Sequence, residues 1–468
     1  AALDKHANLW LADWGNGLYT NTNGRVWRVM PNGPYSSNVV EMAASKNHLY
    51  SVLGGTSGSW GNLYKPAIIE SFVENKWSYK ADWSAKDLFC LAVDPSDPGH
   101  VFAGSWGYGL FEFRDGEQLA QYMPDNSSLQ SIISGGSFVR IGGLAFDDSG
   151  NLWMNNSNVP EPISVLKPDG SWKSFDLDNK LSDFSALHSL LFTQTGHIWM
   201  IVARSNGLFA MDTNGTPDDE SDDVYKRFSV IDRNGKVITN DVRCFAEDRQ
   251  GNIWLGTNQG VLVIYSPWRL FHEEGVYAQE VLIPKNDGSG NADVLLGDMV
   301  VSSIAVDGAN RKWLGTEGGG VFLVSDDGQR TIATFNAANS PLLSDNIIDI
   351  CVNGVSGEVF FGTDAGIISY MGEAHDGSRF YENVVVYPNP VREGYEGKVA
   401  IKGLVEETTV KITDISGNIV FETESLGGQA LWDGTNFAGQ RVATGVYLIF
   451  LSNSDGSQSH ITKLLFIH

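Results

Sequence analysis

Short apolar segments alternate with glycine-containing turns over most of the chain. In the clearest unit, 251–265, the segments 252–256 and 261–265 are rich in β-branched and aromatic residues, and 257–260 is rich in turn formers. Such runs are typical of short strands, and turn formers between two of them indicate a hairpin. A further apolar segment, 242–248, leads into this hairpin through a turn at 248–251. The unit therefore predicts a small set of consecutive strands.

The unit recurs with an aromatic residue at the position of Trp254. Its counterparts are Trp10, Tyr50, Phe102, Trp153, Trp199, Trp313 and Phe360. Trp10 and Tyr50 lie 40 residues apart, and Trp199 and Trp254 lie 55 apart. Propeller blades repeat at about 40 to 50 residues and carry four strands each. Together with the lack of long amphipathic patterns, this spacing predicts an all-β protein whose main domain, 1–380, is a β-propeller.

The number of blades has two interpretations. Eight anchors are present, but the first unit has no room for a leading strand, and the last unit, 347–371, lacks a clear fourth strand. We favour seven blades, with residues 1–30 forming the end of a preceding, truncated propeller. The alternative is a ring of eight blades that the two ends of the repeat array close together.

A different pattern begins after Phe380. The segment 384–387 is extended, Pro388, Asn389 and Pro390 interrupt it, and six further short apolar segments follow with turn signals between them. Many short strands of this kind predict a small antiparallel sandwich. We therefore assign residues 384–468 to a second, Ig-like domain.

Charge and cysteine content exclude several classes of protein. The 468 residues carry a net charge of −24, which argues against nucleic acid as a partner. No stretch is apolar enough for a transmembrane helix, and the first residues lack a signal-peptide profile, so we expect either a removed leader or a fragment. Cys90, Cys244 and Cys351 lie in apolar segments of different units, which predicts buried free thiols and no disulfide framework.

Catalytic signatures are missing from the sequence. It contains no G-x-S-x-G, no H-E-x-x-H and no Cys/His metal spacing. His188 and His197 flank one predicted hairpin, for which turn or strand-end roles are favoured over a metal pair. We therefore expect a protein that is not an enzyme, although propeller loops can assemble a site from distant segments.

One acidic loop has the residue types of a calcium site. Asp212, Asn214, Asp218, Asp219 and Asp222 supply oxygen donors around a glycine turn. Calcium takes about 6 to 8 oxygen ligands, so this loop is a candidate for Ca²⁺, with a solvated acidic loop as the alternative. The loop at 286–293 has fewer carboxylates, and there a plain loop is favoured.

Aromatic residues in equivalent turns provide the candidate ligand site. Trp14 and Trp106 each follow an anchor by four residues, Trp60 lies in the corresponding turn between them, and Tyr108 adds a hydroxyl. Equivalent turns of successive blades emerge on one face, so partly exposed indoles there could stack on sugar rings. The alternative is that these rings fill gaps between blades.

The end of the chain resembles the C-terminal sorting domain of proteins exported by the type IX secretion system of Gram-negative bacteria. The motifs that carry the resemblance are Pro388-Asn389-Pro390, Val410 to Asp414 with Gly417, Trp432-Asp433-Gly434, Gly445 with Tyr447, and Lys463. The W-L-G-T-x-x-G repeats at Trp254 and Trp313 are similar to propeller units in sensor domains of hybrid two-component regulators.

The combination of these two parts resembles the PorZ-like surface proteins of the type IX system. This resemblance implies two propellers before the sorting domain, whereas the chain has room for one and a piece. It also implies a location at the cell surface or outer membrane, partners that include a sortase and two outer-membrane proteins, and presentation of anionic lipopolysaccharide. In this family the sorting domain is retained, although the residues themselves leave retention and cleavage open. The alternatives are a secreted carbohydrate-binding cargo protein and a propeller polysaccharide lyase or hydrolase.

Overall fold

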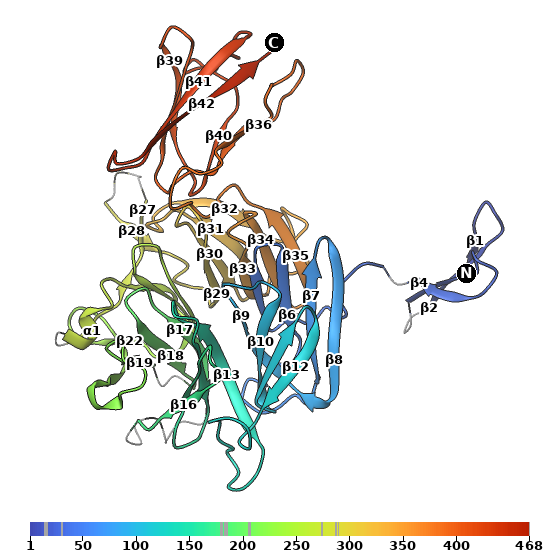
Figure 1. Cartoon of the computed structure of the whole chain (residues 1–468), viewed down its shortest axis with the longest axis vertical. Helices are drawn as coiled ribbons and strands as arrows, with labels where there is room; N and C mark the ends of the chain where they lie inside the picture. The colour runs from blue at the N-terminus through green and yellow to red at the C-terminus, as the bar shows by residue number, and fades with distance from the viewer. Residues whose placement is uncertain are drawn as a thin grey trace.

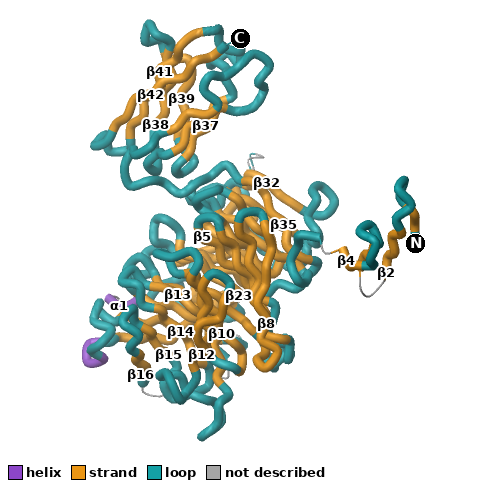
Figure 2. Tube along the Cα trace, turned by 45° about the vertical axis from the view of Figure 1, so that its right-hand side comes forward, coloured by secondary structure: helices purple, strands orange, loops and turns teal. Residues whose placement is uncertain are grey.

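Seven β-sheets stand around a common axis and form the body of the molecule (Figures 1 and 2). The computed structural model describes residues 1–13, 17–29, 31–177, 181, 186–204, 207–272, 275–285, 288 and 290–467. The innermost strands of neighbouring sheets lie side by side around the ring, and the last of them, β33, lies against the first, β5. The seven-bladed all-β propeller predicted from the repeat is thereby confirmed.

Blades 1 to 4 each contain four antiparallel strands. Blade 1 comprises β5 (Glu41–Ser45), β6 (His48–Val52), β7 (Pro66–Val73) and β8 (Lys76–Lys86). Blade 2 comprises β9 (Leu88–Val93), β10 (His100–Gly107), β11 (Leu110–Arg114) and β12 (Glu117–Tyr122). Blade 3 comprises β13 (Val139–Phe146), β14 (Leu152–Asn156), β15 (Ile163–Leu166) and β16 (Trp172–Phe175). Blade 4 comprises β17 (Leu187–Phe192), β18 (His197–Val202), β19 (Leu208–Asp212) and β20 (Val224–Phe228). The end of β10 also pairs with β13, which joins blades 2 and 3.

Blades 5 and 6 repeat this pattern, and blade 7 is shorter. Blade 5 comprises β23 (Val242–Glu247), β24 (Ile253–Thr257), β25 (Gly260–Ile264) and β26 (Gln279–Glu280). Blade 6 comprises β29 (Val301–Val306), β30 (Lys312–Thr316), β31 (Gly320–Val324) and β32 (Thr331–Phe335). Blade 7 comprises β33 (Ile347–Val352), β34 (Glu358–Thr363) and β35 (Gly366–Met371). Small elements lie between blades: η1 (Glu220–Asp222), the hairpin of β21 (Val230–Ile231) and β22 (Val237–Thr239), α1 (Arg269–His272), and the hairpin of β27 (Leu282–Pro284) and β28 (Ala292–Val294).

Three tryptophan anchors of the ring, Trp153, Trp254 and Trp313, are each fixed by an aspartate six residues earlier in the chain. Trp254 Nε1 donates to Asp248 Oδ2 at 2.8 Å, and the same bond joins Trp153 to Asp147 at 2.9 Å. Asp248 also accepts from the backbone amides of the turn at 250 and 252. Because one carboxylate satisfies both the turn and the buried indole, the motif sets the position of the anchor as well as the bend before it.

Blade 7 closes the ring against blade 1 through polar and apolar contacts. The Met42 amide donates to Asp349 Oδ2 at 2.8 Å, and Asn353 Nδ2 donates to the carbonyl of Lys46. Leu49 and Phe360 are buried in the same seam. The two ends of the repeat array are thus joined by side chains and not by a shared sheet.

A small sheet at the beginning of the chain lies apart from the ring (Figures 1 and 2). It contains β1 (Ala2–Leu3), β2 (Leu9–Asp13), β3 (Gly17–Thr20) and β4 (Trp27–Val29). Trp10 Nε1 bonds Asp4 Oδ2 at 3.3 Å, as the anchors of the ring bond their aspartates. Trp10 is nevertheless only half-buried, and Leu3 is 68% exposed. The blade-like geometry supports our proposal that residues 1–30 belong to another propeller.

The last part of the chain forms two facing sheets, as predicted for an Ig-like sandwich. One sheet has the order β36 (Val385–Tyr387), β37 (Val399–Lys402) and β40 (Gln429–Trp432). The other has the order β39 (Ile419–Glu424), β38 (Thr409–Thr413), β41 (Gly445–Ser452) and β42 (Ser459–Phe466). Trp432, Tyr447 and Phe466 pack together between them. The boundaries 1–380 and 384–468 stay our proposed division of the chain.

The sandwich is joined to the propeller by a closely packed junction. The two terminal nitrogens of Arg249 pair with Asp376 in the connecting segment and with Glu406 in the sandwich. A Cβ on Gly308 would lie 2.0 Å from the carbonyl oxygen of His375, so the backbones meet where a side chain would not fit. The Asp376 amide donates to the Gly354 carbonyl at 2.7 Å. These contacts hold the sandwich on the turns that follow β23, β29 and β33.

Candidate functional site

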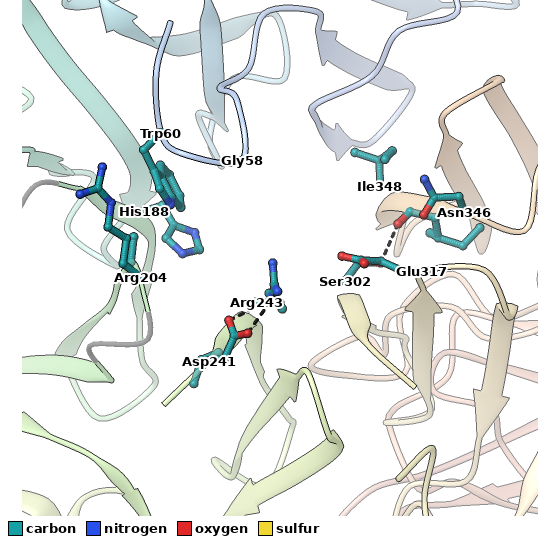
Figure 3. Close-up of a pocket in the computed structure, with 13 residues that line it drawn as sticks. Gly58, Trp60, His188, Arg204, Asp241, Arg243, Ser302, Glu317, Asn346 and Ile348 are labelled. Atoms are coloured by element: carbon teal, nitrogen blue, oxygen red, sulfur yellow. Dashed lines mark hydrogen bonds and ion pairs between the residues drawn. The ribbon is translucent and has the colours of Figure 1, made fainter. Parts of the chain in front are cut away.

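A cavity of about 710 Å³ lies where the inner strands β17, β23, β29 and β33 begin (Figure 3). It is the mouth of the central channel, and segments from blades 1, 4, 5, 6 and 7 line it. The sandwich contacts the turns at the opposite ends of the same strands. We call this cavity the channel mouth, and it therefore opens on the face away from the sandwich.

One wall of the channel mouth is aromatic. Trp60, in the loop between β6 and β7, packs on His188 with ring centres 4.7 Å apart and on Trp106 at 5.5 Å. Trp106 Nε1 donates to the carbonyl oxygen of Trp60 at 3.1 Å, which fixes the backbone that carries the indole. The half-buried Trp60 ring thus forms a fixed apolar surface beside the cavity.

The buried carboxylate of Asp87 holds the loop that carries Trp60. Asp87 is fully buried and accepts from the backbone amides of Leu63, Tyr64 and Lys65 at 2.9 to 3.1 Å. Three consecutive amides on one carboxylate fix the loop, because leaving such donors unpaired inside the protein is costly. Sequence analysis missed Asp87, whose role depends on a loop more than twenty residues earlier.

The same side of the channel mouth carries positive charge. Arg204 Nη2 donates to the carbonyl oxygen of Ser59 at 3.0 Å, and Arg243 binds both carboxylate oxygens of Asp241 at 3.1 Å. Burial and the neighbouring Arg243 lower the pKa of His188 to about 3, so His188 is neutral at pH 7. Because Asp241 occupies two donors of Arg243, the guanidinium of Arg204 is the group on this wall that is suited to an anionic ligand group.

The opposite wall is polar and carries Ser302, Glu317 and Asn346 (Figure 3). Ser302 Oγ donates to the Ile347 carbonyl oxygen at 2.6 Å, so its hydroxyl is engaged with backbone and not with a base. Asn346 Nδ2 donates to Asp364 Oδ2 at 3.2 Å. The cavity thus combines an aromatic face, two guanidinium groups, the carboxylates of Asp241 and Glu317, and an amide, and these groups suit a polar ring.

The structure places the predicted aromatic residues in different environments. Trp60 lines the channel mouth. The expectation that Trp106 is partly exposed is wrong, because its indole is fully buried against Trp60, Phe89 and Arg140. Tyr108 is half-buried beside the core of blades 1 and 2, and Trp14 lies outside the described residues. Arg204, Arg243 and Asn346 were not predicted from the sequence, because they come from three blades and share no local motif. Ligand binding at Trp60 and Tyr108 stays a prediction.

The residues proposed for calcium are each engaged with a different partner. Asp212 lies 3.5 Å from His197 Nε2, Asp218 pairs with Lys167, and Asp219 accepts from the Ser221 amide. Asp222 accepts from Thr216 Oγ1, and Asn214 donates to the Asp222 carbonyl. Over the described parts of the chain, no three His, Cys, Asp or Glu side chains gather closely enough to hold a metal ion. Calcium binding stays a prediction, and residues 286, 287 and 289 of the loop at 286–293 lie outside the described residues.

The predicted free thiols occupy the inner strands. Cys90 is fully buried, Cys244 and Cys351 are half-buried, and none is bonded to another cysteine. Burial raises the pKa of each thiol, so all three stay protonated at neutral pH.

The residues of the sorting motif meet at the end of the sandwich. Asn389 Nδ2 donates to the Lys463 carbonyl at 3.0 Å, and the Leu465 amide donates to Asn389 Oδ1 at 3.1 Å. Gly445 begins β41, and Tyr447 packs on Trp432 and Phe466. The segment around Pro388 and Pro390 therefore fastens the final strand of the chain. Their part in sorting stays a prediction.

Comparison with known proteins agrees with this architecture. Residues 391–457 match the FlgD Ig-like domain family, and residues 236–259 match the two-component regulator propeller family. No curated protein sequence matches the chain. A solved structure of PorZ, an essential bacterial surface component of the type IX secretion system of Porphyromonas gingivalis, matches with 28% identity and a TM-score of 0.72. The chain resembles PorZ over its whole length.

The chain spans 65% of the length of that PorZ chain, and the resemblance to PorZ-like proteins expected from its motifs is confirmed. The extracellular domain of a hybrid two-component system protein from B. thetaiotaomicron matches at 12% identity and a TM-score of 0.49, over all of this chain and 61% of its own. Virginiamycin B lyase from Staphylococcus aureus matches at 14% identity and a TM-score of 0.33, over 70% of this chain and 95% of its own. Among the described helices, none has the length and apolar character needed to cross a membrane.

Proposed function

We propose that this protein is a non-enzymatic surface component of a type IX secretion system. The observation that carries the proposal is the match of both propeller and sandwich to PorZ across the entire chain. Its partners in this proposal are a sortase and outer-membrane proteins of the attachment machinery.

The junction supports a sandwich that stays attached as a docking module. A protease needs an extended, accessible segment, whereas the segment after β35 is bonded on both sides. The Gly428 amide donates to the His375 carbonyl at 2.8 Å, and the Ser378 amide donates to the Leu404 carbonyl at 2.8 Å. The propeller side contributes Arg249 and the Gly354 carbonyl. In a cargo protein this segment would have to open before the tail could be removed.

The channel mouth is the site we propose for the anionic part of a lipopolysaccharide glycan. Trp60 offers a face for a sugar ring, and Arg204 offers donors for a phosphate or carboxylate, whereas Nε and one terminal nitrogen of Arg243 are bonded to Asp241. The protein as a whole carries a net charge of −24, so an anionic glycan would meet repulsion elsewhere on the surface.

Two measurements in native cells test the proposal. The protein recovered from the cell surface should have an intact mass that extends to His468, whereas a mass that ends before β36 would make it a cargo protein. Deleting the gene should stop the surface attachment of other proteins that carry such sorting domains. Normal attachment in the deletion strain would contradict a role in the machinery, and turnover of a polysaccharide by the purified protein would contradict the non-enzymatic role.

A further inference from the structure

The seam between blades 7 and 1 has a smaller buried core than the other seams of the ring. Its buried residues are Val39, Met42, Leu49 and Phe360, whereas the six clusters in the other seams each contain at least eight. Partly buried side chains, including Trp77, pack around these four. Because less apolar area is buried here, polar contacts carry a larger share of the closure of the ring.

A carboxylate of β33 crosses this seam. Asp349 Oδ2 accepts from the Met42 amide of blade 1 at 2.8 Å, and Asp349 Oδ1 accepts from Ser303 Oγ of blade 6 at 3.0 Å. Ser303 Oγ in turn accepts from the Ile350 amide at 2.9 Å. One acid therefore connects the inner strands β29, β33 and β5 of three consecutive blades.

A second acid lies beside Asp349. Glu41 directly precedes Met42 in the chain, so Asp349 Oδ2 lies within about 5 Å of the Glu41 Cα. Glu41 Oε1 accepts from the Leu91 amide of blade 2 at 2.9 Å. Two carboxyl groups therefore meet in the channel wall at the point where the ring closes.

No basic side chain is paired with either acid in the part of the chain that the structure describes. The titratable groups that face them are the thiols of Cys351, Cys90 and Cys244, which stay protonated at neutral pH. Burial, together with the charge of Asp349, raises the pKa of Glu41 to about 8, and burial raises the pKa of Asp349 to about 6. At neutral pH the two acids thus hold one proton, and its loss leaves two like charges in the seam.

We infer that Glu41 and Asp349 form a proton-dependent latch: the seam between blades 7 and 1 stays closed while the two acids share a proton, and it is the first part of the ring to open when that proton leaves. Opening returns both acids to water, where they ionise readily, so the opening reaction releases protons. Its equilibrium constant therefore rises by up to about tenfold per pH unit for each proton released. The latch is separate from the channel mouth and does not depend on the ligand proposed there.

The three cysteines report on three different seams. Cys351 packs in the seam between blades 7 and 1, Cys244 in the seam between blades 5 and 6, and Cys90 in the seam between blades 2 and 3. A buried thiol reacts with an alkylating reagent only after its surroundings open locally. Once exposed, all three are ordinary thiols. The ratio of two labelling rates therefore cancels the effect of pH on the thiol itself and compares the opening of two seams.

Labelling of the full chain with N-ethylmaleimide tests the inference. Peptide mass spectrometry measures the rate at each cysteine at pH 6 and pH 8, with reagent dilute enough for the rate to report the open population. We expect the Cys351-to-Cys244 ratio to rise at least tenfold between these two pH values, and the Cys90-to-Cys244 ratio to change by less than about threefold. A constant Cys351-to-Cys244 ratio would overturn the latch, as would an equal rise at Cys90.

Two variants connect the opening to the acids. Glu41→Gln keeps an acceptor for the Leu91 amide but has no proton to lose, so its Cys351-to-Cys244 ratio should not change with pH. Asp349→Asn keeps an acceptor for the Met42 amide and removes the like charge, so its rise should be smaller than that of the parent. Glu424→Gln, at an exposed position of the sandwich, is the matched control and should keep the full rise. A full rise in both Glu41→Gln and Asp349→Asn would also overturn the inference.

Discussion

The ammonium group of Lys312 in blade 6 lies 3.2 Å from Asp248 Oδ2 in blade 5, and both side chains are buried. Lys312 Nζ also lies 4.5 Å from the centre of the Trp254 ring and donates to the Asp326 carbonyl. One carboxylate therefore holds a turn, an anchor indole and the neighbouring blade.

Replacing Lys312 with alanine should strongly destabilise the ring. Removing one partner of a buried pair leaves the other charge uncompensated and costs about 3–5 kcal/mol. We expect a lower midpoint in urea unfolding, with part of the loss recovered when Asp248→Asn is added. Lys411→Ala breaks an exposed pair with Glu422 and should cost less than about 1 kcal/mol. If Lys312→Ala and Lys411→Ala lowered the free energy of unfolding by the same amount, this role of Lys312 would be contradicted.

The acids Glu41 and Asp349 in the channel wall should make stability depend on pH. Burial, and for Glu41 also the neighbouring Asp349, raises the pKa of Glu41 to about 8 and that of Asp349 to about 6. Between about pH 4.5 and 8 the unfolded chain therefore releases protons that the folded chain keeps. The free energy of unfolding should fall as pH rises through this window and become level above it.

Glu41→Gln should remove most of this dependence. We expect the variant to be more stable than the parent at pH 8, by about 4 kcal/mol, and close to it at pH 4. Glu424→Gln, at an exposed position of the sandwich, should not change the pH profile. A parent protein whose unfolding midpoint rises from pH 5 to 8, with no effect of Glu41→Gln, would rule out the explanation.

Arg204→Ala and Arg243→Ala should each weaken binding of the anionic glycan. A lost charge-assisted hydrogen bond reduces affinity by about tenfold to a hundredfold. Calorimetry with the purified anionic polysaccharide part of lipopolysaccharide measures the change in affinity. A neutral polysaccharide is the ligand control, and Arg392→Ala is the control for loss of a surface arginine. Unchanged affinity in both cavity variants would show that the glycan does not bind at the channel mouth. It would not contradict the proposed role in the secretion system.

Gly308→Val should loosen the sandwich. The added side chain would collide with the His375 carbonyl oxygen. This collision would push the connecting segment away from blade 6. We expect faster proteolysis between β35 and β36 and a broader distribution of shapes in small-angle scattering. Gly33→Val is the matched control, because a Cβ there meets nothing within 4 Å and, as at Gly308, the backbone is not left-handed. Similar proteolysis of parent and Gly308→Val would show that the contact does not hold the junction.

Calcium at the acidic loop has a direct test. If Asp218 and Asp222 help to bind it, adding millimolar Ca²⁺ to chelator-treated protein should raise the melting temperature, because a ligand of the folded state stabilises that state. The double variant Asp218→Asn/Asp222→Asn should lose the shift. If Ca²⁺ does not raise the melting temperature of the parent, or raises that of the double variant equally, the loop is a solvated acidic loop that does not bind calcium.

The repeat could be predicted because its signal is local. Trp153, Trp254 and Trp313 each sit in one strand with their aspartate six residues away, and a short window contains the whole motif. Trp199 shows the limit of this pattern. Thr193 replaces the aspartate there, and in the described structure Trp199 Nε1 has no hydrogen-bond partner. The same anchor residue in two blades therefore does not imply the same hydrogen bonds around its indole.

The channel mouth could not be predicted because its residues are distant in sequence. Trp60 was identified from its turn, but the direction of Trp106 depends on bonds to a loop that lies 46 residues earlier. Arg204, Arg243 and Asn346 become neighbours of one cavity only when the ring closes. Closure itself rests on pairs such as Met42 and Asp349, which are 307 residues apart.

The placement of the channel mouth and the sandwich at opposite ends of the same strands has an evolutionary consequence. Loops that begin the inner strands can change in length and sequence without moving the turns on which Arg249 and Gly308 sit. In the function we propose, ligand preference and attachment to the assembly would thus be encoded in separate sets of loops. Under that proposal, relatives of this protein could diverge in what they recognise while they keep the same mode of attachment.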